Sequence, residues 1–274
     1  MPKTLHDKWL WRKVFDRHPV YQQLTDKLGV RDWIRDNGID VALVDVLWEG
    51  DDARDIPDEF FSPGHVIKTN HGCATNIFLK EPPYDREAII EEANDFLKLR
   101  FGRRQRMFGY YGIEPKLFVE PFVEGLHCEV KYFTFGGRIP FATCIYLEDN
   151  TADMWLLNED GTTVRSDGLP SFVDGPANRP LPEFFAQGLE HAREISKHFD
   201  HMRVDFMHDG QRLLLGELTV YNLGGNFRSI PIDEWGKLND AWDILDSPFF
   251  ASELRGWRRW YANAVRRTRR GQAT

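Results

Sequence analysis

The spacing of apolar residues along the chain predicts blocks of helix and blocks of strand. Helical spacing occurs over residues 4–15, 20–28, 30–37, 86–101 and 181–199 and over the last 40 residues. Apolar runs of strand length occur over residues 41–47, 65–68, 76–80 and 116–120. Because the strands and helices come in blocks and do not alternate strictly, the pattern favours an α+β fold with antiparallel sheets.

Two further segments have the pattern of antiparallel hairpins. In the first, residues 129–135 and 138–147 flank the pair Gly136-Gly137. In the second, residues 202–207 and 212–218 flank a turn at Asp209-Gly210. Glycine supplies the positive φ that tight hairpin turns require, so both segments are predicted to fold back on themselves.

Composition narrows the class of protein. Apolar residues make up 42% of the 274 residues, with nine Trp and twenty Phe, which indicates a packed interior. No run reaches the roughly 18 apolar residues that cross a bilayer, and the N-terminal segment lacks the apolar run of a signal peptide. The three cysteines form no CxxC pair, so neither a disulfide framework nor a zinc knuckle is indicated. We expect a reduced, cytoplasmic setting.

Charge is distributed unevenly along the chain. The net charge is −8, yet the segment from Arg255 onward carries seven arginines and no acidic residue, which leaves −15 on the rest. An acidic body does not suit a nucleic-acid-binding protein. Trp257 and Trp260 lie among these arginines, which is typical of docking at an anionic membrane surface, here the inner face of the membrane. The alternative is that the Trp side packs a terminal helix onto the core while the arginines are solvated.

The second hairpin contains two carboxylates, Asp205 and Glu217, on neighbouring strands and among apolar residues. Burying a carboxylate is costly unless a cation or a metal neutralises it. Oxygen ligands of this kind suit Mg²⁺, whereas an internal salt bridge to Arg203 or Arg212 is the alternative. The metal hypothesis carries a register condition. A turn with an even number of residues puts the two carboxylates on opposite faces, and an odd turn or a bulge brings them together.

Lys68 and Lys131 lie on predicted strands, where a lysine that points into a cleft suits a polyphosphate. An exposed edge or an ion pair is the ordinary alternative for each. Asn70, His71 and Gly72 follow Lys68 in a turn whose backbone amides are candidates to face phosphate. Glu120 ends a strand and is followed by Pro-Phe-Val, so backbone groups with Phe122 or Val123 as a platform are candidates to hold a purine. An ordinary exit from a strand is the alternative.

In this order, the segments resemble the ATP-grasp superfamily, and within it the family typified by the teichuronopeptide biosynthesis protein TupA. The resemblance covers about residues 26 to 230, beginning at Asp26-Lys27 and Arg31. The matching segments are Val66-Ile-Lys-Thr-Asn-His-Gly72, Val119-Glu-Pro-Phe-Val-Glu124, Glu129-Val-Lys131, Arg203-Val-Asp-Phe206, Gly216-Glu-Leu-Thr-Val-Tyr221 and Gly224-Gly225. Each motif is loose, and the ordered set is specific. This chain departs from the family at Cys73-Ala74, where a second glycine is usual.

The resemblance implies an ATP-grasp fold in which two lobes, each of antiparallel sheet plus helix, sandwich ATP. Residues 1–60 would form a helical or small α/β N-terminal region, 61–125 the small lobe and 126–274 the large lobe. Lys68 and Lys131 would hold the phosphates, together with the turn at Asn70 and Gly72. Glu120, Phe122 and Val123 would hold adenine and Glu129 the ribose. The ligands of Mg²⁺ would be Asp205, Glu217 and Thr219, the last of which stands where many superfamily members carry Asn.

The resemblance also implies a carboxylate–amine ligase that works through an acyl phosphate, in bacterial cell-surface glycopolymer or polysaccharide synthesis. Lys68, Lys131, Arg203 and Arg228 are its candidate catalytic residues, and Arg228 with Gly224 and Gly225 is a candidate acceptor pocket. The alternatives are a kinase for a sugar or small alcohol and a non-catalytic nucleotide-binding protein. The expected substrates are a small carboxylate and an amine, and the sequence does not indicate the oligomeric state. We expect the histidines near residue 205 to be surface or supporting residues and not to converge on a metal.

Overall fold

The computed structural model describes residues 1–126, 128–148, 151–164, 180–225 and 232–271. Its contacts divide the chain into two compact units. The first unit comprises residues 1–18, 130–204 and 219–274, and the second comprises residues 19–129 and 205–218. The three predicted regions, with boundaries at residues 60 and 125, stay a prediction.

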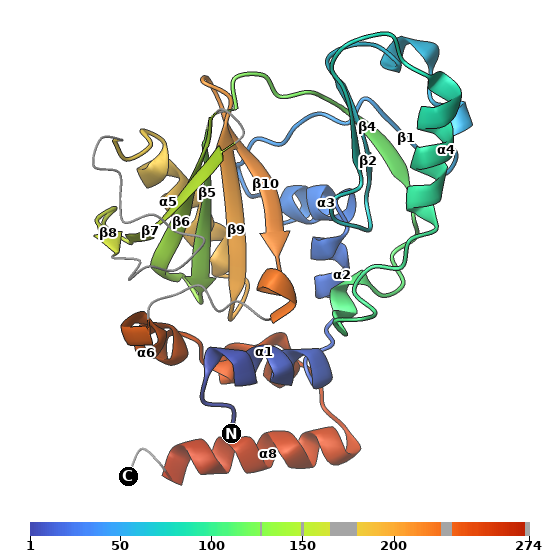
Figure 1. Cartoon of the computed structure of the whole chain (residues 1–274). Helices are drawn as coiled ribbons and strands as arrows, with labels where there is room; N and C mark the ends of the chain where they lie inside the picture. Colours follow the sequence, from blue (N-terminus) through green and yellow to red (C-terminus); the bar gives the residue numbers. More distant parts are fainter. Residues whose placement is uncertain (127, 149–150, 165–179, 226–231, 272–274) are drawn as a thin grey trace. The chain divides into compact units, whose positions relative to one another are not determined.

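The second unit contains a four-stranded antiparallel sheet with the strand order β1-β4-β2-β3 (Figure 1). Its strands are β1 (Trp48–Gly50), β2 (His65–Thr69), β3 (Asn76–Leu79) and β4 (Leu117–Pro121). Its helices are α2 (Val20–Thr25), α3 (Gly29–Asp36) and α4 (Arg86–Leu97), with short 3₁₀ turns at Ala53–Asp55, Asp58–Phe60 and Phe108–Tyr110. The predicted strands at 65–68, 76–80 and 116–120 and the helix beginning at Arg86 are therefore confirmed.

Helix α4 covers one face of this sheet. It begins after Asp85, whose side chain accepts a hydrogen bond from the Ala88 amide at 3.1 Å and so caps the helix. Ile90 and Ala93 of α4 share a buried apolar cluster with Ile67 of β2 and Val119 of β4. Because strand side chains alternate between faces, the residues on either side of Ile67 and Val119 belong to the face away from α4.

The predicted strand over residues 41–47 is wrong. This segment forms only an isolated bridge, in which Ala42 pairs with Leu214 of the second hairpin, and strand structure begins at Trp48. Within it, the Val44 carbonyl accepts a hydrogen bond from the Arg31 guanidinium at 2.5 Å. A β-ladder needs consecutive backbone groups that are free to pair with a neighbouring strand. Here the Arg31 side chain already occupies the Val44 carbonyl.

The first unit begins with α1 (Leu5–Val14) and ends with α8 (Gly256–Gly271). Its other helices are α5 (Phe185–Ser196), α6 (Ile232–Ala241) and α7 (Pro248–Ala251), with 3₁₀ turns at Asn222–Gly225 and Ile244–Asp246. Thr4 caps α1: its hydroxyl accepts from the Asp7 amide, and the Asp7 carboxylate accepts from the Thr4 amide. No helix in the described part of the chain is both long and apolar enough to cross a membrane.

The larger sheet has the strand order β10-β9-β5-β6-β7-β8. Its strands are β5 (Cys128–Phe135), β6 (Arg138–Glu148), β7 (Thr151–Asn158), β8 (Thr163–Val164), β9 (Met202–His208) and β10 (Leu213–Thr219). Both predicted hairpins are present, β5–β6 and β9–β10. Gly136 and Gly137 in the first turn take φ of +56° and +86°, as that turn requires. Strand β7, which pairs with β6 along eight residues, has no counterpart among the predicted elements.

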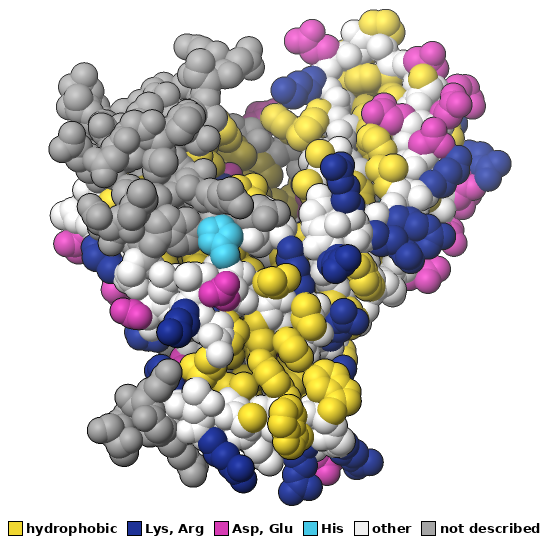
Figure 2. Space-filling view, turned by 60° about the horizontal axis from the view of Figure 1, so that its bottom comes forward, with side chains coloured by type: hydrophobic (Ala, Val, Ile, Leu, Met, Phe, Trp, Pro, Cys, Tyr) yellow, Lys and Arg dark blue, Asp and Glu magenta, His cyan; other side chains and the backbone are white. Residues whose placement is uncertain are grey.

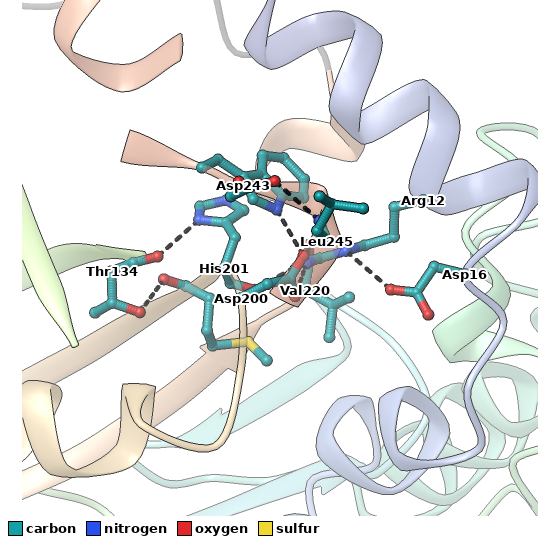
Figure 3. A network of polar contacts seen from close by, with 10 residues as sticks. Arg12, Asp16, Thr134, Asp200, His201, Val220, Asp243 and Leu245 are labelled. Carbon is teal, nitrogen blue, oxygen red and sulfur yellow. Dashed lines mark hydrogen bonds and ion pairs between the residues drawn. The ribbon is translucent and has the colours of Figure 1, made fainter. Parts of the chain in front are cut away.

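A buried ionic network anchors β9 and the residue after β10 to helix α1 (Figure 3). One Arg12 guanidinium nitrogen lies 2.5 Å from Asp200 Oδ1, and the other donates to the carbonyl oxygens of His201, at 2.9 Å, and Val220, at 3.4 Å. Asp16 lies 3.8 Å from the Arg12 Nε, and Arg12, Asp16 and Asp200 are all buried. His201 and Val220 flank the strands that carry Asp205 and Glu217, so this network sets where those strands begin and end.

His201 was expected to be either a surface or a supporting residue, and the structure excludes the surface position. Its side chain is 1% exposed, and its Nδ1 is bonded to the Thr134 carbonyl at 2.9 Å. Burial lowers the pKa of His201 well below its ordinary value, and the Arg12 charge lowers it further. The imidazole is therefore neutral and belongs to the core between Phe135 and Trp242. The described part of the chain holds no group of three or more His, Cys, Asp or Glu able to enclose a metal.

Candidate nucleotide site

Lys68 and Glu120 lie on the face of the small sheet that points away from α4. Val66 pairs with Glu120 and Lys68 pairs with Phe118 across β2 and β4, so these four side chains share one face. Diagonal neighbours on such a face come within reach of long side chains. The Lys68 Nζ lies 2.5 Å from Glu120 Oε2. The lysine that the sequence singled out thus points along the sheet toward the strand end expected to hold adenine.

Glu120 is a buried carboxylate shared by two cations. It is 5% exposed, and its second oxygen, Oε1, forms an ion pair with the Arg31 guanidinium of α3. A buried carboxylate requires such compensation, and two charge-assisted partners supply it. Because Arg31 pairs with one oxygen of Glu120 independently, Lys68 can move to another anion while the Glu120 carboxylate keeps a cationic partner.

These residues line a cavity inside the second unit, with a volume of about 120 Å³. Its charged lining residues are Lys27, Arg31, Lys68, Glu120 and Glu217. Its apolar wall includes Leu24, Val30, Phe118 and Met207. Three cations against two carboxylates make the charged lining net positive, which suits an anionic ligand. Pockets for whole drug-sized ligands usually measure about 300–1,000 Å³, so this cavity is the size of a phosphate group and its immediate surroundings.

Lys27 also lines this cavity, and its Asp26-Lys27 segment formed part of the family motif without an assigned role. Its Nζ donates to the Gly72 carbonyl oxygen. Burial lowers the pKa of Lys27, and the nearby Glu217 carboxylate opposes this shift. A lysine ammonium that lines this cavity near a carboxylate is well placed to meet a phosphate.

The turn after Lys68 is held by Asn70. Its side-chain amide donates to Asp26 Oδ1 at 3.1 Å and to the Glu114 carbonyl at 3.0 Å, and it accepts from the Lys116 amide at 2.8 Å. Asn70 is 1% exposed, so in this structure it joins the α2–α3 connection to β2 and β4. Gly72 has its own requirement, because a Cβ there would lie 2.3 Å from the Phe101 ring. The predicted contact of Asn70 and Gly72 with ATP stays a prediction.

The departure from the family at Cys73-Ala74 has a conformational consequence. Ala74 adopts φ of +59°, in the left-handed region that favours glycine, and it stands within the two residues where the family usually has its second glycine. Both Cys73 and Ala74 are exposed. The backbone of this turn therefore keeps a shape suited to glycine although the sequence carries alanine.

We predict that Ala74→Gly stabilises the protein. A side chain in the left-handed region costs about 1–2 kcal/mol, and the extra flexibility of an unfolded glycine offsets roughly half of this gain. The net increase in the free energy of unfolding should be about 0.5–1 kcal/mol, measured by thermal and denaturant unfolding. Ala88→Gly, in the first turns of helix α4, is the control and should change stability by a similar amount in the opposite direction. If both variants lowered the free energy of unfolding by the same amount, the backbone at Ala74 would not be strained.

The predicted adenine platform lies where β4 leaves the sheet. Phe122 is partly exposed, and its amide donates to the Gly64 carbonyl at 2.7 Å, so this backbone donor is already used. Its ring meets Phe78 edge to face at 6.1 Å, and Phe78 is 50% exposed. Val123 is also partly exposed. The exposed aromatic pair offers a stacking surface, and adenine binding by Glu120, Phe122 and Val123 stays a prediction.

The β9–β10 turn decides part of the register condition for Asp205 and Glu217. Asp209 pairs with Arg212 through the amide-to-carbonyl bond at 3.3 Å, which leaves two residues in the turn. A regular ladder from that pair sets Asp205 opposite Gly216. In such a ladder the Asp205 side chain and the side chain of the next residue, Glu217, point to opposite faces of the hairpin. A Cβ on Gly216 would lie 3.3 Å from the Met207 methyl, which agrees with this register. Asp205 is buried and Glu217 is exposed. Shared Mg²⁺ binding stays a prediction, and it requires a bulge between the turn and Asp205.

Three predicted site residues belong to the first unit, and one lies outside the described residues. Lys131 is on β5 and Arg203 is on β9, where its guanidinium donates to Asn222 Oδ1. Thr219 ends β10, and its hydroxyl oxygen is buried without a hydrogen-bond partner among the described residues. Such an orphaned oxygen fits a residue awaiting a ligand. Arg228 falls outside the described residues. Glu129 is on β5 within the second unit and is half-buried.

The donor chemistry of the second unit fits Mg²⁺ and nucleotide together. Mg²⁺ in nucleotide sites uses one or two carboxylates plus phosphate oxygens, so a cage made only of protein ligands is not required. Glu217 supplies an exposed carboxylate at the edge of the cationic cavity, and Lys27, Arg31 and Lys68 supply the positive charge for phosphates. The arrangement therefore suits the binding of a magnesium-bound polyphosphate.

Comparison with known proteins identifies a family for this chain. A family model described as TupA-like ATPgrasp matches residues 7–238. No curated protein matches the chain significantly. Among solved structures, the chain is similar to the ATP-grasp ligase PsnB with a phosphomimetic variant of its minimal precursor, Mg and ADP, at 14% identity and a TM-score of 0.46. That match covers 81% of this chain and 59% of PsnB.

Two D-alanine–D-alanine ligases are similar to a comparable degree. The enzyme from Helicobacter pylori has 12% identity and a TM-score of 0.44, with coverage of 80% of this chain and 61% of that chain. The enzyme from Bacillus anthracis complexed with ATP has 14% identity and a TM-score of 0.47, with coverage of 80% and 64%. The chain thus spans about 60% of the length of the first solved structures that it matches.

The predicted α+β fold of antiparallel sheets with flanking helices is confirmed. The family model covers most of the chain, from α1 to α6, and takes in Lys68, Glu120, Asp205 and Glu217. The chain belongs to the TupA-like ATP-grasp family.

Proposed function

We propose that this protein is an ATP-dependent ligase that joins a carboxylate to an amine through an acyl phosphate. The observation that carries the proposal is the cationic cavity of the second unit, in which Lys68 and Arg31 flank Glu120. Membership of an ATP-grasp family supports the use of ATP. The setting in bacterial cell-surface glycopolymer synthesis, at the cytoplasmic side, is part of the proposal and rests on the family alone.

The residues have distinct proposed roles. Lys68 and Lys27 bind and orient phosphate oxygens, and Arg31 keeps Glu120 neutralised when Lys68 turns to the nucleotide. Lys131 also binds phosphate, Glu129 binds the ribose, and Glu120, Phe122 and Val123 bind the adenine. Asp205, Glu217 and Thr219 would hold Mg²⁺, which would supply charge neutralisation for the transferring phosphoryl group. Arg203 and Arg228 are proposed to orient the carboxylate.

Phosphorylation is needed because a carboxylate oxygen is a poor leaving group. A carboxylate oxygen attacks the γ-phosphorus of ATP, the bond between that phosphorus and the bridging oxygen breaks, and ADP leaves. The amine then attacks the acyl carbon, phosphate leaves with the former carboxylate oxygen, and the amine proton passes to solvent. Positive side chains around the phosphates stabilise the charge that develops in the first step.

The test is an assay with ATP, Mg²⁺ and a panel of carboxylates and amines, in which ADP and phosphate are measured. A carboxylate labelled with ¹⁸O should pass one label to phosphate for each amide formed. Hydroxylamine should trap the acyl phosphate as a hydroxamate. A stable phosphoester without label transfer would instead show a kinase. Tight ATP binding with no turnover across the panel would show a non-catalytic nucleotide-binding protein, and either result would overturn the ligase.

A further inference from the structure

Two helices of the first unit expose an apolar surface that the nucleotide site does not use. Leu10 and Val14, one turn apart on α1, are 63% and 48% exposed. Trp257 and Trp260 on α8 are 60% and 73% exposed. We call these four residues the α1–α8 patch. Figure 2 shows apolar side chains gathered on the lower part of this face, with lysine and arginine side chains at its margin.

The patch has a firm base. Phe15 of α1 stacks on Tyr261 at 4.6 Å and meets Trp257 edge to face at 6.0 Å. The Trp11 indole donates to the Tyr261 hydroxyl at 2.8 Å, and Ala262 and Val265 are buried in the core of this unit. One side of α8 therefore holds the helix in place. Packing of this side does not account for the tryptophans, because Trp257 and Trp260 lie largely outside it.

The charge around the patch is positive. Arg258, Arg259 and Arg267 are exposed on α8, which carries no acidic residue, and none of the three forms an ion pair with a described residue. The Arg258 guanidinium lies 5.7 Å from the Trp257 ring centre. The seven arginines from Arg255 onward contrast with a charge of −15 on the rest of the chain. An anionic partner is attracted to this segment and repelled by the remainder.

We propose that the α1–α8 patch docks on an anionic membrane surface. Tryptophan rings suit the boundary between headgroups and acyl chains, Leu10 and Val14 add apolar contact, and the arginines meet lipid phosphates and carboxylates. A bilayer fits this combination better than an acidic protein does, because largely exposed tryptophans need an apolar phase as well as negative charge.

The test is co-sedimentation of the full chain with phosphatidylcholine vesicles, with and without phosphatidylserine. The protein should bind only the vesicles that contain phosphatidylserine, and added salt should weaken the binding. Trp257→Ala with Trp260→Ala, and separately Arg258→Glu with Arg259→Glu, should each lower vesicle affinity about tenfold or more. Unchanged thermal unfolding of both double variants would show that the fold is intact.

Arg103→Ala with Arg104→Ala is the matched control. It removes two exposed arginines from a turn of the second unit that carries no tryptophan, and it should leave vesicle binding within about twofold. Three results would overturn the proposal. These are the absence of binding by the unaltered protein, binding that survives loss of both tryptophans, and equal binding to neutral vesicles. A dimer that the tryptophan variant disperses, without vesicle binding, would assign the patch to a second copy of the chain instead. Neither the vesicle measurement nor its controls depend on ATP turnover.

Discussion

Lys68→Met should lower the rate of ATP turnover about 10²–10³-fold, the usual loss when one preorganised donor to a developing negative charge is removed. The structure limits the accompanying structural damage. Arg31 still neutralises Glu120 in the variant, so no buried carboxylate is left without a cation. The variant should therefore unfold at nearly the same temperature as the unaltered protein, and its defect should appear in kcat and in the affinity for ATP.

Lys116→Met is the matched control for this variant. Lys116 immediately precedes β4 in the same unit, and its ammonium pairs with Glu49 at 2.9 Å on the surface. Loss of an exposed pair of this kind changes stability by at most about 1 kcal/mol, and turnover should stay within a few-fold of the unaltered rate. If the Lys68→Met variant turned over ATP as fast as the Lys116→Met variant, Lys68 would have no role in binding the phosphates. Steady-state kinetics of ADP release, with ATP affinity from calorimetry, provides the comparison.

Asp200→Ala should lower the free energy of unfolding by about 3–5 kcal/mol, because it leaves the Arg12 guanidinium buried without its nearest carboxylate. It also removes the acceptor of the Trp242 indole, which now lies 2.6 Å from Asp200 Oδ2. Since the Arg12 guanidinium also holds the carbonyls of His201 and Val220, the loss should loosen the strands that carry Asp205 and Glu217. Chemical denaturation and hydrogen exchange across β9 and β10 measure both effects.

Glu159→Ala provides the contrast for an exposed ion pair. Glu159 pairs with Arg193 of α5, where both side chains are more than one third exposed, and its loss should cost less than about 1 kcal/mol. The single variants Arg12→Met and Asp200→Ala and the variant that combines them form a double-mutant cycle. The double variant should lose less stability than the two single variants together, because it removes the two partners of the Arg12–Asp200 ion pair at once and leaves neither of them without the other. Additive losses would mean that the pair contributes no coupling.

Local sequence signals predicted elements where the cause of structure is itself local. Thr4 and Asp85 lie at helix starts because their side chains bond amides within the next turn. Gly136 and Gly137 close the first hairpin because only a flexible backbone takes both positive φ values cheaply. The segment at 41–47 shows the limit of this reasoning. Its apolar run fits a strand, but the Arg31 side chain occupies one of its carbonyls, and Arg31 comes from a helix that precedes it.

The second hairpin lies between these cases. Its turn was expected at Asp209-Gly210, and the observed turn residues are Gly210 and Gln211. Asp209 explains the shift, because its carboxylate accepts bonds from the amides of Gln211 and Arg212, at 2.9 Å and 2.6 Å. These bonds from one side chain fix the number of residues in the turn, and that number sets which residues pair along β9 and β10. It therefore determines whether the Asp205 and Glu217 side chains lie on the same face of the hairpin, which the spacing of apolar residues alone does not predict.

The sequence by itself determined the family, because the order of loose motifs from Lys68 to Glu217 survives without any knowledge of contacts. It also indicated that Lys68 and Glu120 matter, although not that they pair. Only the tertiary structure decided their partners. Arg31 and Glu120 are 89 residues apart and Arg12 and Asp200 are 188 apart, so their pairing depends on how the strands are ordered in space. It likewise decided that Trp257 and Trp260 face outward, since only packing against α1 fixes which side of α8 is buried. Local propensity acts over one or two turns, whereas charge compensation and burial act between segments that the fold brings together.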